Sequence, residues 1–380
     1  GVGGASNPTS DRILDKFEGA LRPTDNRTFV PVHYPAELPV DPSVAAGQAP
    51  LGQSIADAGN HPVLVVGYSE GSLVAEMYKR SLIADGSPNA GTLQFLFLAS
   101  PFVPNGGIYA RFPELRLPGY VSTGTAAPSP YDEIFVTLEY DPVGDFPAYA
   151  NPLSLANAAA GMLYVHGDQG PDNVDLEHDP QSVLVVSSPE GGTDTYVLIR
   201  AEHLPLLQPM RDLSTALQTT GLTEPVLGAI EPTLRLAIDM GYTDRDYQNA
   251  DRPTRFSLFT PPERIAETLR DLPDAIAQGA DNFVNELPSA PSNSVDQPKP
   301  VQQSPESTPK PKPAPEIKKL KPAEPRAALT TAVSRTLPDL KPKADRADRT
   351  DGTPKRDTVK PRKAGKDAKA KSDAPSRKGR

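Results

Sequence analysis

The feature that most constrains this sequence is a serine between two glycines, at the junction of two different patterns. Residues 63–66 are consecutive aliphatic residues, which predicts a short strand buried on both faces, as in a parallel sheet. Residues 73–78 carry apolar side chains at helical spacing. The pentapeptide GYSEG, residues 67–71, joins the two. Between a strand and a helix, G-x-S-x-G is typical of a nucleophile elbow, a strained turn that needs small neighbours. We therefore interpret Ser69 as a nucleophile rather than as part of an ordinary glycine-rich turn.

Segments typical of strands and of helices alternate around this turn. Further strands are expected within residues 28–35, 91–101, 134–140, 182–188 and 193–200, the last two forming a hairpin or two adjacent strands. Helices are expected within residues 11–21, 50–60, 152–168, 225–242 (interrupted at Pro232) and 262–284. This alternation predicts an α/β fold with an open, mostly parallel sheet.

The two ends of the 380-residue chain differ in composition. Residues 301–380 contain 22 Lys and Arg against 10 Asp and Glu, a net charge of +12, whereas residues 1–300 carry −21. The last aromatic residue is Phe283, and proline-rich segments follow it, which favours extended chain over a packed core. These contrasts predict one α/β domain over residues 1–286 and a disordered, proline-rich basic tail over residues 287–380.

The composition also bears on cofactors and on the compartment. The sequence has no cysteine, which excludes disulfides and thiolate metal sites. Neither His166-Gly-Asp168 nor Glu177-His178-Asp179 matches a known ligand spacing, so no metal or other cofactor is expected. No apolar run approaches the roughly 20 residues of a transmembrane helix. The sequence starts with glycine rather than methionine, which indicates either a removed signal or anchor segment or a sequence trimmed at this end. We expect a secreted or envelope-associated protein.

The basic tail indicates a preference for anions. Lys and Arg neutralise phosphates and other anionic groups without reading a sequence. The tail has no aromatic residue on which a base would stack, so specific nucleic-acid binding is not expected. We expect contact with an anionic envelope component or another polyanion, or a plain solvated linker.

A nucleophilic serine needs a histidine to take its proton and a carboxylate to orient that histidine. In the α/β-hydrolase order, the acid and then the histidine follow the serine. Of the five histidines, two precede the serine and a third lies in an acidic loop typical of a solvated surface: His33, His61 and His178. His166 and His203 remain as candidate bases. Local topology favours His203, which follows a predicted strand by three residues.

Two aspartates are suited to hold the histidine. Asp141 follows the predicted strand of residues 134–140 directly, and Asp145 comes four residues later. An aspartate before proline or after glycine is also common turn chemistry, so one of the two is expected to cap a turn. The residues leave the choice open, with Asp141 preferred.

Five segments occur in an order that resembles the PE-PPE-type serine hydrolase domain of mycobacteria and their relatives: GYSEGSLVAEMYKR, YDPVGDFP, NPLSLANAAAGMLYVHGD, TYVLIRAEHLPLLQPMR and EPTLRLAIDMGY. The resemblance covers roughly residues 1–260. It implies a cutinase-like α/β-hydrolase fold and a Ser–Asp–His triad that hydrolyses acyl-ester or lipid substrates through an acyl-serine. The alternative is transfer of the acyl group to a trehalose-type envelope glycolipid. A second alternative is an inactive hydrolase fold that binds the envelope or a polyanion.

The resemblance also bears on the choice of histidine. The recurring histidine of the family falls in a G-x-x-x-V-H element, which here spans residues 161–166. The position of His203 is often asparagine in the family. The resemblance therefore implies His166 as the base, against the preference of local topology for His203.

An oxyanion hole should complete such a site. Its first donor is expected to be the backbone N–H after the nucleophile, that of Glu70. The second is expected from the glycine-rich loop near the start of the sequence, at Gly4 or Ala5. The strand that the family places before this loop is missing from the sequence, so we expect weaker support for the hole.

Overall fold

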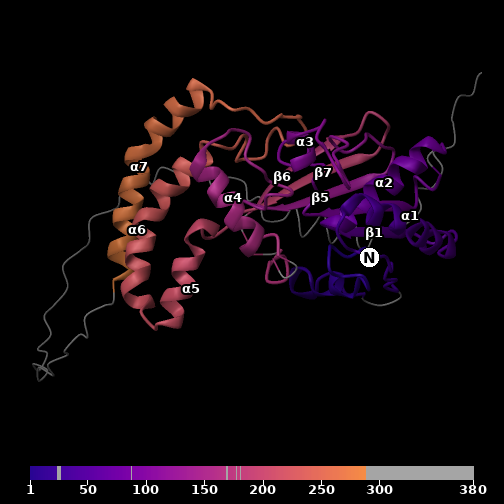
Figure 1. Cartoon of the computed structure of the whole chain (residues 1–380), viewed down its shortest axis with the longest axis horizontal. Helices are drawn as coiled ribbons and strands as arrows, with labels where there is room; N and C mark the ends of the chain where they lie inside the picture. Colours follow the sequence, from indigo (N-terminus) through magenta and orange to yellow (C-terminus); the bar gives the residue numbers. More distant parts are fainter. Residues whose placement is uncertain (24–26, 87, 168–169, 177, 180, 288–380) are drawn as a thin grey trace, which may run out of the picture. The chain divides into compact units, whose positions relative to one another are not determined.

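A mostly parallel sheet organises the structure (Figure 1). The computed structural model describes residues 1–287 apart from 24–26, 87, 168–169, 177 and 180. In these residues the strands β1 (Val63–Tyr68), β2 (Leu93–Leu98), β5 (Asp132–Leu138), β7 (Thr193–Ile199) and β6 (Gln181–Ser187) lie side by side in that order. The first four run parallel, and β6 pairs antiparallel with β7. The predicted α/β class is confirmed, and the segments 182–188 and 193–200 form a hairpin.

Helices and a small second sheet surround these strands. The helices are α1 (Val40–Asp57), α2 (Glu70–Ala84), α3 (Ile108–Arg111), α4 (Pro152–Tyr164), α5 (Gln208–Ala216), α6 (Thr220–Asp239) and α7 (Pro262–Glu286). Short 3-10 helices are η1 (Asp11–Asp15), η2 (Phe17–Gly19) and η3 (Pro205–Leu207). The strands β3 (Arg116–Leu117) and β4 (Tyr120–Val121) pair antiparallel.

Both faces of the central sheet are apolar. On one face Phe97 stacks on Phe135 with ring centroids 4.9 Å apart, and Phe135 stacks on Tyr196 at 5.1 Å. Side chains of α1 and α2 pack in the same cluster. On the other face the aliphatic side chains of the strands pack against η1, η2 and Val174. Burial on two sides explains why these strands are continuous apolar runs rather than alternating patterns.

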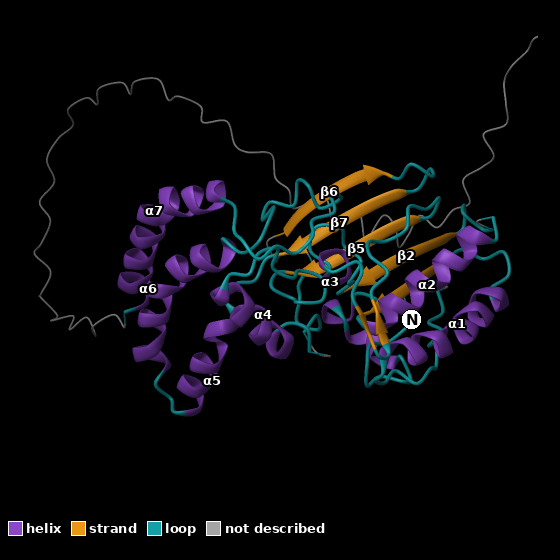
Figure 2. Ribbon diagram, turned by 45° about the horizontal axis from the view of Figure 1, so that its top comes forward, coloured by secondary structure: helices purple, strands orange, loops and turns teal. Residues whose placement is uncertain are grey.

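The helices α4–α7 lie beyond the end of the sheet toward which β2 and β5 point (Figure 2). A separate apolar cluster joins α6 and the loops after β5 and β7, with Tyr140, Leu204, Leu227, Ile238 and Tyr242 at its centre. The carboxyl ends of the parallel strands therefore meet these helices. In open α/β sheets this edge is where functional side chains collect.

The first predicted helix, residues 11–21, is wrong. The segment forms η1 and η2, separated at Lys16, and both Phe17 and Glu18 have a positive φ. The N–H groups of Phe17 and Glu18 donate to the carbonyls of Pro171 and Asp172. These bonds to a distant loop replace the helical bonds that the apolar spacing predicted.

Three other boundaries differ from the prediction. Residues 28–35 form no strand, because Pro31 and Pro35 lack an N–H, and the N–H groups of Val32 and Tyr34 donate to two different loops, at Gly1 and Pro8. The helix expected at residues 50–60 begins at Val40 and carries Pro50 in its interior. The helix α6 continues through Pro232 instead of being interrupted there.

The predicted tail lies outside the described residues, apart from Leu287. The helix α7 ends at Glu286, and the division into a domain and a tail at this point stays a prediction. In the part of the chain that the structure describes, no helix combines the length and the apolar character needed to span a membrane.

Candidate functional site

Ser69 occupies a strained turn between β1 and α2. Its φ of 53° and ψ of −114° lie in a region that L-residues with a side chain rarely adopt. Its N–H donates to the carbonyl of Leu98 at the end of β2 (3.0 Å). A Cβ at Gly67 would come within 2.6 Å of the carbonyl oxygen of Gly71, and a Cβ at Gly71 would collide with the carbonyl of Val2. The two glycines of the pentapeptide are thus required by the close approach of strand, helix and the first residues of the chain.

His166 reaches the serine from two residues beyond α4. Its Nε2 lies 2.8 Å from Ser69 Oγ, and its ring packs against the ring of Tyr68 with centroids 5.9 Å apart. The hydroxyl of Tyr68 donates to the carbonyls of His166 (2.5 Å) and Gly167 (2.9 Å). One residue of the elbow therefore fixes both the ring and the backbone of the histidine. The sequence analysis missed this role of Tyr68, because nothing in the pentapeptide shows where a tyrosine hydroxyl points.

Asp141 lies on the other side of the imidazole. Its Oδ1 is 2.8 Å from His166 Nδ1 and also accepts the N–H of Val143 at 2.9 Å. The side chain of Asp141 is buried. A carboxylate in this position favours the tautomer in which Nδ1 carries the proton, which leaves Nε2 free to accept from Ser69 Oγ. The arrangement can therefore withdraw a proton from the serine hydroxyl.

Two opposing effects set the basicity of His166. Burial lowers the pKa of the imidazole, while the charge of Asp141 and its hydrogen bond raise that pKa. The second effect wins, and the pKa of His166 is raised from its ordinary value of 6.5. An imidazole must be neutral to accept a proton, so His166 can act as a base only above this raised pKa.

The other candidate acid and the other candidate base lie away from this contact. Asp145 is buried against Arg245, with its Oδ1 2.5 Å and its Oδ2 3.0 Å from the two guanidinium nitrogens. His203 is 44% exposed and lies 3.2 Å from Glu231 Oε2. The structure brings Asp141 and His166 to the serine, whereas Asp145 and His203 pair with other residues. The catalytic roles themselves stay predictions.

The glycine-rich loop lies against the nucleophile. A Cβ at Gly4 would be 3.2 Å from the Cβ of Ser69, so the backbone of this loop touches the serine. In the described part of the chain, neither the N–H of Gly4 nor that of Glu70 donates to an acceptor. The two amides fit the expected oxyanion donors, while Ala5 is an exposed residue of the turn that follows Gly4.

The loop is better supported than we expected from the sequence. Val2 forms a parallel bridge with Gly67, and its N–H and C=O bond to Val66 (2.8 Å) and Tyr68 (3.1 Å). Tyr34 Oη donates to the carbonyl of Gly3 at 2.6 Å. The expectation of weak support is therefore wrong, because residues around Val2 take the edge position beside β1 and fix the loop.

Two cavities lie near the elements that carry the site. One of about 400 Å³ is lined by residues of α1, α2 and the segment around β4, and Leu73, Met77, Phe102 and Tyr109 are among its lining residues. Another of about 970 Å³ follows the edge of β1. Among the described residues, no group of three or more His, Asp or Glu is arranged to hold a metal ion.

Comparison with known proteins places the chain in a family. The family model described as the PE-PPE domain matches residues 18–243. Esterase PE16 of Mycobacterium tuberculosis is 38% identical over 254 residues, which are 64% of this chain and 45% of that protein. Diacyltrehalose acyltransferase Chp2 of the same organism is 32% identical over 207 residues, 50% of this chain and 53% of that protein. The chain thus spans about half the length of these curated relatives, and no solved structure matches it. Because the family match covers more than half of the sequence, the chain belongs to the PE-PPE domain family.

Proposed function

We propose that the protein is a serine esterase that hydrolyses acyl esters. The observation that carries this proposal is the hydrogen-bonded series Ser69 Oγ, His166 Nε2 and Nδ1, Asp141 Oδ1, with both contacts at 2.8 Å. Such a series activates a hydroxyl that is otherwise a poor nucleophile. The series also speaks against the alternative in which the fold is an inactive binding module. The esterase among the relatives supports the same chemistry.

The proposed reaction proceeds in two halves. Ser69 Oγ attacks the ester carbonyl carbon while His166 Nε2 takes its proton, and the N–H groups of Glu70 and Gly4 stabilise the oxyanion. The tetrahedral intermediate collapses, and the alcohol leaves with the proton from His166. Water then attacks the acyl-serine, again losing its proton to Nε2, and the carboxylic acid leaves as Ser69 regains the proton.

The alternative is acyl transfer, in which an alcohol replaces water in the second half. Relatives named diacyltrehalose acyltransferase Chp2 and SL1278 acyltransferase Chp1 favour this candidate. The acyl-serine is common to both outcomes, and the access of water to it decides between them. Work at the cell envelope, an expectation from the sequence, suits either reaction and stays a prediction.

The smaller cavity is suited to an acyl chain. Its lining is mostly apolar, with Asp41, Gln48 and Thr123 as its polar members. Leu73 in this lining lies about one helical turn beyond Ser69 on α2. A volume of about 400 Å³ falls in the range of small-molecule sites. We propose that the acyl group of the substrate enters this cavity while its carbonyl stays at Ser69.

A panel of p-nitrophenyl esters with increasing acyl length tests the function. We expect release of p-nitrophenol and free acid, and an acylated product when a sugar alcohol is added if transfer operates. Met77→Trp, which fills the cavity, is expected to reduce turnover of long-chain esters more than that of acetate ester. No turnover and no acyl-enzyme with any ester would refute the proposal.

The two aspartates are expected to differ. Asp141→Asn removes the charge that holds the imidazole tautomer, so turnover should fall roughly 10⁴-fold with the fold preserved. Asp145→Asn breaks a buried ion pair, so it should lower the melting temperature, and its loss of turnover should be far smaller than that of Asp141→Asn. Turnover per folded molecule, measured for both variants, tests this expectation. A larger loss of turnover in Asp145→Asn than in Asp141→Asn would contradict the assignment of Asp141 as the triad acid.

A further inference from the structure

The loop that carries Asp141 needs an external support. Asp141 comes three residues after the last residue of β5, and the residue before it, Tyr140, has a φ of 67°. A tyrosine rarely adopts this left-handed conformation, and it persists only where surrounding contacts enforce it. The position of the Asp141 carboxylate therefore depends on whatever holds the backbone of residues 140 and 141.

Asp145 supplies two of the contacts that hold this backbone. Its Oδ2 accepts the N–H of Tyr140 at 2.8 Å, and its own N–H donates to the carbonyl of Asp141 at 2.6 Å. The side chain of Asp145 is fully buried. A buried carboxylate that lacks a cation becomes protonated or moves toward water, so these contacts depend on a charge partner.

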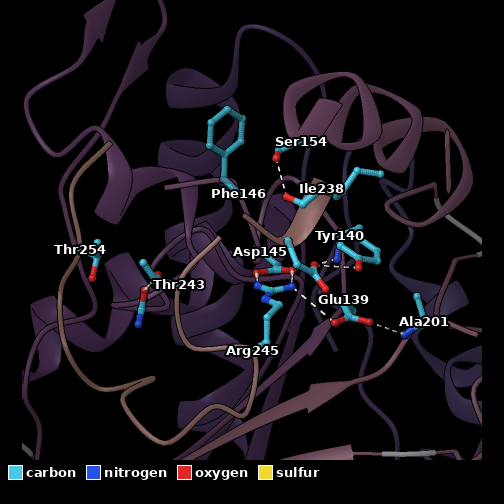
Figure 3. Close-up of polar contacts among 12 residues, drawn as sticks. Glu139, Tyr140, Asp145, Phe146, Ser154, Ala201, Ile238, Thr243, Arg245 and Thr254 are labelled. Carbon is cyan, nitrogen blue, oxygen red and sulfur yellow. Dashed lines mark hydrogen bonds and ion pairs between the residues drawn. The ribbon is translucent and has the colours of Figure 1, made fainter. Parts of the chain in front are cut away.

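Arg245 is that partner, and it comes from the segment after α6. Figure 3 shows its guanidinium group facing the Asp145 carboxylate, and each of its two terminal nitrogens donates to one carboxylate oxygen (3.0 and 2.5 Å). The guanidinium also packs against the ring of Tyr242, 4.3 Å from its centroid. A two-point pair of this kind fixes the direction of the carboxylate as well as its charge.

We propose that Arg245 is a positioning residue for the triad: it fixes Asp145, and through Asp145 and the backbone of Tyr140 it fixes Asp141 against His166. This inference rests on the proposed function. In the described residues Arg245 contacts neither Ser69 nor His166. It also lies beyond residues 18–243, the part that matches the family.

Other charged groups surround this pair and bear on any test by pH. Glu139 lies 3.5 Å from Arg245 and is itself paired with Arg200 and Arg235. Asp239 accepts from Tyr140 Oη at 2.9 Å, and burial raises its pKa to about 6. Arg111 is a second buried cation that the Asp145 charge stabilises. Among the described residues, the ionisable groups around the imidazole are Asp141 and Tyr68, with the Lys16–Asp172 pair beyond the tyrosine ring.

The experiment compares Arg245→Met and Arg245→Lys with the unchanged full chain in kcat, KM and the acid limb of kcat/KM. In Arg245→Met we expect kcat to fall about 100-fold at nearly unchanged KM, since a displacement of about 1 Å in catalytic geometry costs this much. Asp141 should then raise the pKa of His166 less, so the acid limb should move to lower pH. Arg245→Lys keeps the charge but not the two-point bond, so its kcat and its acid limb should lie between those of the unchanged chain and those of Arg245→Met.

Arg211→Met is the matched control. Arg211 is also buried and paired with two carboxylates, Glu231 and Glu224, but it does not contact the loop of residues 139–145. The variant Arg211→Met should have a lower melting temperature, while kcat per active site and the acid limb of kcat/KM stay unchanged. Active sites are counted by labelling with a fluorophosphonate, so that loss of folded protein is separated from loss of turnover.

The outcomes are distinguishable. The inference is overturned, and Arg245 is only structural, if Arg245→Met keeps the full kcat per labelled site and the acid limb of kcat/KM does not move. If Arg245→Met does not fold, the same result for Arg245→Lys overturns the inference. If the unchanged chain hydrolyses esters and Ser69→Ala does not, the proposed function stands whatever Arg245 does. If the unchanged chain neither hydrolyses esters nor forms an acyl-serine, the proposed function fails first.

Discussion

Ser69→Ala is expected to reduce ester turnover by about 10⁶-fold while the protein stays folded. The substitution removes the attacking oxygen and the hydrogen bond to His166 Nε2, and it keeps the Cβ that the turn already accommodates. Turnover and labelling by a fluorophosphonate should both be lost, and the circular dichroism spectrum and melting temperature should stay close to those of the unchanged chain.

Ser72→Ala provides the control on the same helix. Ser72 Oγ is buried and donates to the carbonyls of Gly67 and Leu98, and neither its hydroxyl nor its backbone bonds to His166. Loss of the Ser72 hydroxyl should lower the free energy of unfolding by about 1 kcal/mol, as expected for a buried hydrogen bond, while turnover per folded molecule is kept.

Residual turnover of Ser69→Ala within tenfold of the unchanged chain would eliminate Ser69 as the nucleophile.

His166→Ala is expected to inactivate about as severely as Ser69→Ala, because the members of a triad act as a unit. The double variant of Ser69 and His166 should then be no worse than either single one. His203→Ala should cost little turnover, since that side chain is 44% exposed and pairs with Glu231. Steady-state turnover of the four proteins, each corrected for its folded fraction, tests the assignment.

The reverse outcome would be informative. If His203→Ala were inactive and His166→Ala active, the base would be the histidine that follows β7, as local topology suggested. The 2.8 Å contact between His166 Nε2 and Ser69 Oγ would then be without a catalytic role.

The sequence predicted the elbow well because the pattern is local. An apolar strand, two required glycines and a helical spacing are all contained in residues 63–78. The choice of histidine is not local. His203 follows the end of β7, but its side chain pairs with Glu231. His166 follows α4, and its ring lies at Ser69, at the end of β1. The family resemblance implied the histidine that lies at Ser69, because a family pattern carries information on tertiary arrangement, and the role of His166 as the base stays a prediction.

The two aspartates show a limit of a different kind. Asp141 and Asp145 follow the same strand within one short loop, and nothing in their spacing tells which one faces a histidine. The distinction arises from Arg245, whose side chain reaches Asp145 across 100 positions of sequence. Such a pair leaves no local pattern, so the contact between Arg245 and Asp145 could not be predicted; the sequence indicated only that one of the two aspartates caps a turn.

The two wrong elements near the start have a related cause. Residues 11–21 have the apolar spacing of a helix, and residues 28–35 have the alternation of a strand. Both segments instead bond to distant loops, at Pro171 and at Pro8 among others. Local propensity is a weak prior when tertiary contacts supply the hydrogen bonds.

The central claim is that Ser69 is a nucleophile activated by His166. Incubation with a fluorophosphonate, followed by intact-mass analysis and peptide mapping, tests it most directly. We predict one label per molecule, located on Ser69, kept in Ser72→Ala, absent in Ser69→Ala and strongly slowed in His166→Ala. A label on another residue, or a label that persists in Ser69→Ala at the original rate, would contradict the claim.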